Sequence, residues 1–144
     1  MSTIKILNES HYPMVWAIFH GVFEHKYITE FLDVWNARNK DLSIGVFDDQ
    51  QILLGFLLTK QVQNSHQQIE FIGVNPTVQK GGVGTSLLRF IVDYCQQNGL
   101  RVTLIPVNDE KIIGWYKKHG FREYGTPVIS KYTGDLEQTM IYGK

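Results

Sequence analysis

The chain has 144 residues, 43% of them hydrophobic, and its 14 basic side chains balance 14 acidic ones. This size and composition predict a single domain that spans residues 1–144. The balance of charges argues against a nucleic-acid partner. No apolar run approaches the roughly 20 residues that cross a membrane. The single Cys95 excludes an internal disulfide, and residues 1–6 lack the features of a signal peptide, so a cytoplasmic protein is expected.

The N-terminal third predicts a strand followed by two helices. Alternating apolar and polar residues predict a strand at 3–7. Apolar residues at helical spacing predict helices at about 11–23 and 29–38. Acidic and aromatic residues gather where the helices join: Glu24, His25, Tyr27, Glu30 and Asp33. They form either a pocket that attracts a cationic amine or an ordinary solvated helix surface, and the sequence leaves both interpretations open.

The middle of the chain predicts an antiparallel meander of three strands. Strand-like runs cover 43–47, 52–62 and 68–74, and short polar turns join them. A helix over about 82–97 and a strand over 101–105 follow. A strand, helix, strand order gives a right-handed crossover, so the third and fourth strands are expected side by side and parallel.

Two features of this region bear on packing. The expected core-facing side of the helix consists of Val83, Leu87, Ile91 and Cys95. Prolines stand just beyond the ends of the two parallel strands, at Pro76 and Pro106, and ladder hydrogen bonds are expected to fail there.

A glycine-rich turn precedes the helix, and residues 79–84 read Q-K-G-G-V-G. Its glycines leave backbone N–H groups exposed and the helix N-terminus adds partial positive charge, so the turn predicts an anion site for a phosphate or pyrophosphate. A P-loop would need a lysine where Thr85 stands, and a dinucleotide-binding loop would need a glycine where Leu87 stands. Neither nucleotide-binding pattern fits.

The C-terminal third predicts one helix and two strands. Asn108 and Asp109 can cap a helix that runs to about residue 119, with Gly120 as its stop. A strand begins at 121–124, and a last strand over 136–142 is expected to close the sheet.

Two motifs resemble those of the GNAT superfamily of N-acetyltransferases. Q-x-x-G-x-G at 79–84 is similar to its acetyl-CoA-binding signature, and Asn108 followed by W-Y-K-K-H-G-F at 115–121 is similar to its N…Y-x-K-x-G-F pattern. The order of expected elements also matches. The resemblance implies an α/β (α+β) fold: a mixed, mostly antiparallel central sheet with helices on both faces and a parallel splayed strand pair at the acetyl-CoA site.

The resemblance also implies how acetyl-CoA, the co-substrate, is held. Backbone amides of the glycine turn would bind the pyrophosphate, and free backbone groups of the preceding strand would bind the pantetheine arm. The expected cofactor-binding residues are Ile72, Gly73, Val74, Gln79, Lys80, Gly81, Gly82, Val83, Gly84, Thr85, Asn108 and Tyr116. Asn108 lies one residue further from Tyr116 than is common in the family, and the common spacing would select Asp109 instead.

Two residues are expected to be catalytic in direct attack by a primary amine. The resemblance makes Tyr116 the candidate acid for the departing thiolate, and the alternative is a core tyrosine. Glu70 is the candidate base, because alternation places it on the same strand face as Ile72 and Val74. The alternative for Glu70 is a structural or substrate-binding carboxylate.

Rival interpretations concern turnover and partners. The same fold can serve as a non-catalytic acyl-CoA-binding sensor or interaction module, and the glycine turn alone would suit a nucleotide-phosphate binder. The acceptor, a small-molecule or peptide amine, is not specified by the sequence, and the resemblance is compatible with a homodimer. The histidines show no metal-ligand spacing, so no metal is expected.

Overall fold

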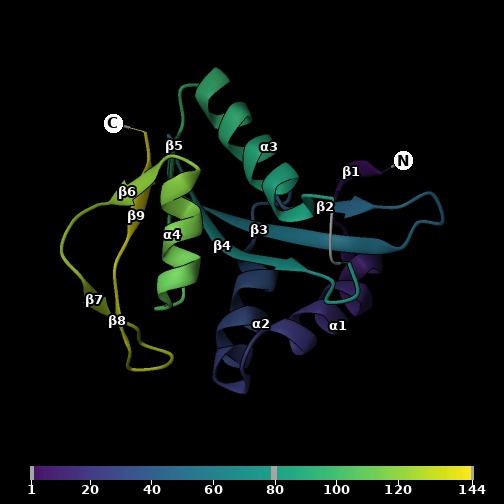
Figure 1. Ribbon diagram of the computed structural model, residues 1–144, viewed down its shortest axis with the longest axis horizontal. Coiled ribbons are helices and arrows are strands. Elements are labelled where there is room, and N and C mark those ends of the chain that lie inside the picture. The colour runs from purple at the N-terminus through teal and green to yellow at the C-terminus, as the bar shows by residue number, and fades with distance from the viewer. Residues whose placement is uncertain (1, 79–80, 144) are drawn as a thin grey trace.

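The fold is built on one seven-stranded sheet with the order β1-β2-β3-β4-β5-β9-β6 (Figure 1). The computed structural model describes residues 2–78 and 81–143. The sheet strands are β1 (Thr3–Ile6), β2 (Ile44–Phe47), β3 (Leu53–Gln63), β4 (His66–Val74), β5 (Arg101–Leu104), β6 (Phe121–Glu123) and β9 (Met140–Tyr142). All neighbouring strands are antiparallel except β4 and β5, which are parallel, so the expected fold class is confirmed.

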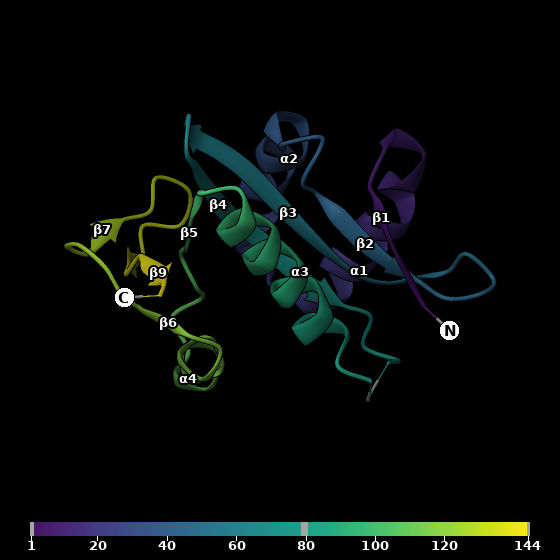
Figure 2. The ribbon, with the colours of Figure 1, turned by 90° about the horizontal axis from the view of Figure 1, so that it is seen from above.

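Helices cover both faces of the sheet (Figures 1 and 2). They are α1 (Tyr12–Val22), α2 (Ile28–Ala37), α3 (Val83–Gln97) and α4 (Glu110–Lys118), with short 3-10 helices η1 (Glu9–His11) and η2 (His25–Tyr27) before α1 and α2. The first two helices pack on one face, and α3 and α4 lie on the other. In the described part of the chain, no helix is both long and apolar enough to cross a membrane.

Each face has its own hydrophobic core. On the α3 face, the predicted residues Val83, Leu87, Ile91 and Cys95 are all buried. On the other face the core is largely aromatic. Phe19 and Phe31 stack with ring centroids 4.1 Å apart, and the Phe71 ring meets both edge-on or nearly so at 5.7 Å. These rings fix α1 and α2 against β4.

The parallel strands β4 and β5 separate partway along their length. Their ladder runs from the His66–Arg101 pair to the Ile69–Leu104 pair. β4 continues to Val74 and remains paired with β3 on its other side. The last five residues of β4 therefore have no partner strand on the β5 side among the described residues.

The separation agrees with one proline and not with the other. Pairing was expected to fail near Pro76 and Pro106; on β5 it ends directly before Pro106, but on β4 it is lost already at Glu70, well before Pro76. β5 ends one residue before Ile105, and the buried Pro106 that follows has no N–H with which to resume a ladder.

A β-bulge lies in β4 at the point of separation. Leu58 pairs with Phe71 and Thr59 pairs with Ile69, which leaves Glu70 without a partner on β3. Ile69 packs in the core beneath α3, whereas Phe71 packs against α1 and α2, although the two are only two residues apart. Strict alternation therefore breaks at Glu70, because an extra residue in one strand reverses the faces that follow it. Glu70 nevertheless lines one cavity together with Ile72 and Val74.

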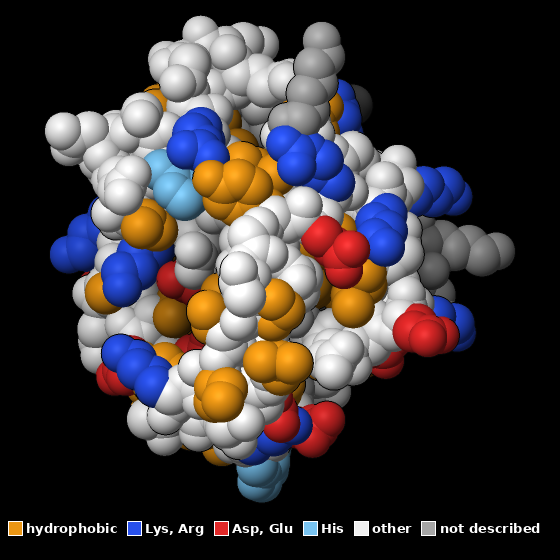
Figure 3. Space-filling model, turned by 90° about the vertical axis from the view of Figure 1, so that its left-hand side faces the viewer, with side chains coloured by type: hydrophobic (Ala, Val, Ile, Leu, Met, Phe, Trp, Pro, Cys, Tyr) orange, Lys and Arg blue, Asp and Glu red, His pale blue; other side chains and the backbone are white. Residues whose placement is uncertain are grey.

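The expected strand over 136–142 is also wrong as a single element. β8 (Leu136–Glu137) pairs with β7 (Val128–Ile129) in a separate hairpin, and only β9 joins the main sheet, between β5 and β6. The break falls at Gln138, where the side-chain Nε2 donates to three backbone carbonyls at 3.1 Å each. The acceptors are Tyr124, Gly125 and Thr139. Figure 3 shows the face that carries this hairpin, with hydrophobic side chains among basic ones.

Candidate active site

The N-terminus of α3 is open toward an anion. Gly81 and Gly82 have φ of 107° and 63°, a region that suits glycine, and no side chain of the described residues caps the helix that starts at Val83. The first N–H groups of a helix have no partner within the helix, so an anion placed there meets free donors and the positive end of the dipole. The expected Gln79 and Lys80 lie outside the described residues.

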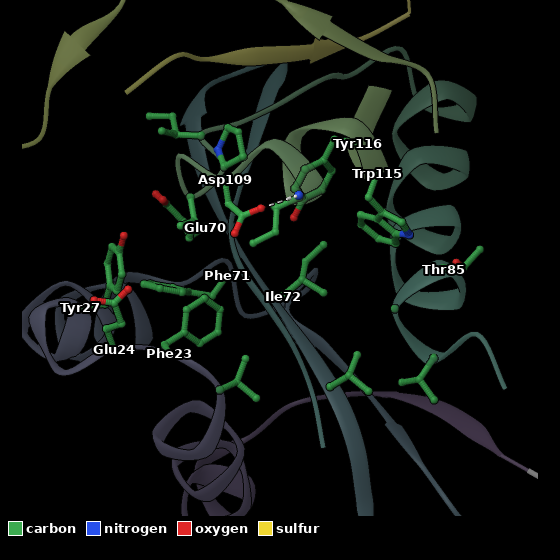
Figure 4. A pocket seen from close by; sticks show the side chains of 18 of the residues that line it. Phe23, Glu24, Tyr27, Glu70, Phe71, Ile72, Thr85, Asp109, Trp115 and Tyr116 are labelled. Carbon is green, nitrogen blue, oxygen red and sulfur yellow. Dashed lines mark hydrogen bonds between the residues drawn. The ribbon is translucent and has the colours of Figure 1, made fainter. Parts of the chain in front are cut away.

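A cavity of about 620 Å³ runs from this helix N-terminus through the gap between β4 and β5 (Figure 4). In Figure 4, Glu70 and Asp109 lie between Tyr27 on one side and Trp115 on the other. The cavity lining brings together these sequence-predicted residues: Glu70, Ile72, Val74, Gly82, Val83, Gly84, Thr85 and Tyr116. The space therefore connects the anion loop to both candidate catalytic side chains.

Three predicted cofactor residues lie off this lining. Gly73 faces the α1 and α2 core, where an added Cβ would come within 2.6 Å of the Phe56 ring. Gly81 is exposed at the loop. Asn108 lines a smaller neighbouring cavity of about 250 Å³. Backbone groups of glycines can serve a ligand without a side chain in the cavity, so the proposed roles of Gly73 and Gly81 concern the main chain alone.

Tyr116 is buried against aromatic rings and still reaches the cavity. Its ring centroid lies 5.0 Å from Trp115 and 5.8 Å from Phe121, and the side chain is 9% exposed. Its hydroxyl has no hydrogen-bond partner among the described residues. Burial raises the pKa of Tyr116, so the phenol keeps its proton across the physiological range and can donate it. Tyr116 can therefore pack in the core and still serve as the proposed acid.

Glu70 stands at the bulge with its carboxylate half-buried in the cavity. The Gln68 side-chain Nε2 donates to both carboxylate oxygens at 3.4 Å. Burial raises the pKa of Glu70, and this outweighs the lowering by Gln68 and by the charge of Lys60. A raised pKa makes the carboxylate a stronger base near neutral pH.

The far end of the cavity is acidic. Of the residues at the helix join, Glu24, Tyr27 and Glu30 line it, together with Glu137 from β8. Burial, and then the charges of Glu137 and Glu70, raises the pKa of Glu30 to about 7. Glu24, Tyr27 and Glu30 therefore line a cavity, and the attraction of a cationic amine stays a prediction. Sequence reasoning missed Glu137, which no local pattern marks.

Two other residues of the helix join are engaged elsewhere. The Asp33 carboxylate accepts a hydrogen bond from the Tyr132 hydroxyl at 2.9 Å, and the His25 ring lies 5.5 Å from that of His20. Neither residue is part of the cavity lining. In the described ranges, no three histidine, cysteine or acidic side chains gather as a metal site.

Asp109 begins α4 and also lines the main cavity. Its Oδ1 accepts hydrogen bonds from the backbone N–H groups of Lys111 at 2.8 Å and Ile112 at 3.4 Å, as a helix N-cap does. Of the two positions that the sequence left open for the cofactor-contacting residue, Asp109 is therefore the one that faces the gap between the strands.

Asp109→Ala is expected to lower the free energy of unfolding by about 1 kcal/mol, because two N–H groups of α4 lose their acceptor. Asp109→Asn should retain most of the stability, since an asparagine side chain can also cap the helix. Chemical denaturation of both variants measures the difference. Equal losses in the two variants would show that the carboxylate charge matters more than the cap.

The chain belongs to the acetyltransferase (GNAT) family, whose sequence profile matches residues 8–121. Among solved structures, Ard1 from Thermoplasma volcanium has a TM-score of 0.79 and 19% identity over 99% of both chains. The ribosomal-protein-S18-alanine N-acetyltransferase from Escherichia coli has a TM-score of 0.75 and 20% identity over 99% of this chain and 93% of that one.

Arabidopsis thaliana Naa50, in complex with the bisubstrate analogue CoA-Ac-MVNAL, has a TM-score of 0.75 and 18% identity over 99% of both chains. At sequence identities this low, the similar structures show only that the fold is shared. The assignment to the family rests on the match to its sequence profile.

Proposed function

We propose that the protein transfers an acetyl group from acetyl-CoA to a primary amine of a small molecule or peptide. The observation that carries the proposal is the continuous cavity through the splayed β4 and β5, open to the α3 N-terminus at one end and to carboxylates at the other. Family membership supports an acyltransferase. The bisubstrate analogue that Naa50 binds joins CoA to a peptide, and such a compound suits direct transfer in a ternary complex.

The residues present fit acetyl-CoA. Backbone N–H groups of residues 81–85 would bind the pyrophosphate, because no described side chain caps the helix that they open. The free β5-facing edge of β4 at Ile72–Val74 would bind the amides of the pantetheine arm in place of a strand. Gln79 and Lys80 complete the proposed loop, and Asn108 or Asp109 would contact the cofactor from the start of α4.

Acetyl-CoA supplies an activated acetyl thioester; the chain supplies acid, base and electrostatic stabilisation. Glu70 takes a proton from the bound ammonium, which frees the lone pair that forms the new C–N bond, and the nitrogen loses a second proton to solvent as the amide forms. Backbone N–H groups on the free edge of β4 stabilise negative charge on the carbonyl oxygen. Tyr116 donates its phenolic proton to the sulfur as the C–S bond breaks. These transfers leave the amide and free CoA and release one proton overall, and exchange with solvent restores Glu70 and Tyr116.

Acetyl-CoA at about a hundred times its dissociation constant is expected to add roughly 2.7 kcal/mol to the free energy of unfolding. For a domain of this length, the melting temperature should rise by about 2–8 °C. Thermal unfolding with acetyl-CoA measures the shift, with ATP and NAD as controls that should give little or none.

The two alternatives to an acetyltransferase predict different results in these experiments. An equal shift with ATP would favour a nucleotide-phosphate binder. A shift specific to acetyl-CoA, without thiol release on any amine, would favour the acyl-CoA-binding module. No shift at millimolar acetyl-CoA would remove the basis of the proposed function.

A further inference from the structure

Four carboxylates surround one end of the main cavity, and we call this end the acidic chamber. Its members are Glu24 before η2, Glu30 on α2, Glu70 on β4 and Glu137 on β8. No lysine, arginine or histidine occurs among the described residues that line the cavity, although the chain as a whole is neutral. The negative charge is therefore a local property of the chamber.

Among the described residues, the charge of the chamber carboxylates is offset only at a distance, by Lys60 at Glu70 and by Lys26 at Glu24. None of them forms an ion pair with a described residue. Burial raises the pKa of Glu70 and of Glu137, and the charge of Glu70 adds to the raising at both Glu30 and Glu137. Like charges held together in a partly dry space raise the free energy of the empty site, and a cationic ligand would lower it.

Tyr27 gives an independent sign of a ligand. Its side chain is only 8% exposed, it lines the cavity, and its hydroxyl has no hydrogen-bond partner in the described part of the chain. The ring is buried while the hydroxyl keeps some exposure, so the hydroxyl is available to a polar group of a bound molecule. The Phe23 ring, whose centroid lies 6.3 Å from that of Tyr27, also offers an aromatic face to an ammonium, whereas the Lys26 ammonium already lies 5.4 Å from the centre of the Tyr27 ring.

The space continues beyond the chamber. The smaller cavity shares Glu24, Tyr27, Val107 and Glu137 with the main one. The acidic residue found only in the smaller cavity, Asp135, is already paired with Lys26 at 2.9 Å. Unpaired negative charge is therefore concentrated at the junction of the two cavities, where a chain-like ligand would pass.

On the basis of the proposed function, we propose that the acceptor is a small linear amine with at least two ammonium groups. One amine loses its proton to Glu70 and is acetylated. The other stays charged among Glu24, Glu30 and Glu137. A peptide would bring neutral amides to the same wall and leave these carboxylates uncompensated, which disfavours it.

The test compares 1,4-diaminobutane with butylamine, which matches its carbon chain but lacks the second charge. Calorimetric titration is run in the presence of CoA, and kcat/KM is measured by thiol release from acetyl-CoA. The diamine is expected to bind and react at least about tenfold better, as hydrogen bonds to charged groups allow. Glu137→Gln should reduce this preference several-fold, while Glu123→Gln, an exposed glutamate on β6, should leave it unchanged.

Three outcomes would overturn the inference. The two amines could bind equally, or the preference could survive in Glu137→Gln and Glu30→Gln alike. The dicationic peptide lysylglycinamide could outperform the diamine. In each case, turnover of butylamine would show that the acetyltransferase proposal stands on its own. Diamine binding without any binding of acetyl-CoA would instead support the chamber and count against the proposed function.

Discussion

Tyr116→Phe is expected to lower kcat by at least about 10²-fold, the lower end of what a positioned proton donor contributes. The reason is that phenylalanine keeps the ring that packs between Trp115 and Phe121 but lacks the proton for the departing sulfur. Because the hydroxyl has no protein partner among the described residues, its removal should leave the fold and the affinity for acetyl-CoA nearly unchanged. Steady-state kinetics and calorimetric titration measure the two quantities separately.

The matched control is Tyr94→Phe, which removes a hydroxyl from an exposed tyrosine on α3. It should alter neither kcat nor affinity. A normal kcat in Tyr116→Phe would eliminate Tyr116 as the acid and leave it as a core tyrosine. A loss of acetyl-CoA affinity with normal kcat would make it a binding residue instead.

Glu70→Gln is expected to lower kcat/KM by about 10²-fold or more at neutral pH, because the amide cannot accept the amine proton. The loss should depend on pH. In the native protein the pKa of Glu70 is raised by burial, so below that pKa the carboxyl is protonated and native and variant rates converge. The difference should be greatest above the pKa of Glu70 and shrink again once the free amine predominates in solution. Rates measured across this range check the profile.

Gln68 supplies a second test of the same role. Its hydrogen bond lowers the pKa of Glu70, so Gln68→Met should move the rising limb of the native profile to higher pH without abolishing activity. A uniform loss in Glu70→Gln at every pH, with no movement in Gln68→Met, would assign Glu70 to substrate positioning. The experiment thus separates the two roles that the sequence left open.

Several parts of the fold could be predicted because they depend on neighbours in the chain. The buried side of α3, from Val83 to Cys95, follows from helical periodicity, and the loop at Gly81 and Gly82 follows from the backbone freedom of glycine. The parallel neighbour of β4 follows from the handedness of the crossover. Together with the motif around Tyr116, these local signals were sufficient for the family.

The geometry of the candidate site depends instead on contacts distant in sequence. Glu70 stands at a bulge because of the register between β3 and β4, and alternation within one strand carries no information about that register. Gln138 ends β8 by bonding to a turn more than ten residues away, and this brings Glu137 to the cavity.

The sequence by itself therefore determined most of the elements, the anion loop and the family, since periodicity and turn chemistry are local. Only the tertiary structure decided where β4 and β5 separate and which carboxylates gather in the acidic chamber. The reason is physical: glutamates from α2, β4, β8 and the segment before η2 approach one another through strand pairing and core packing, which no single segment encodes.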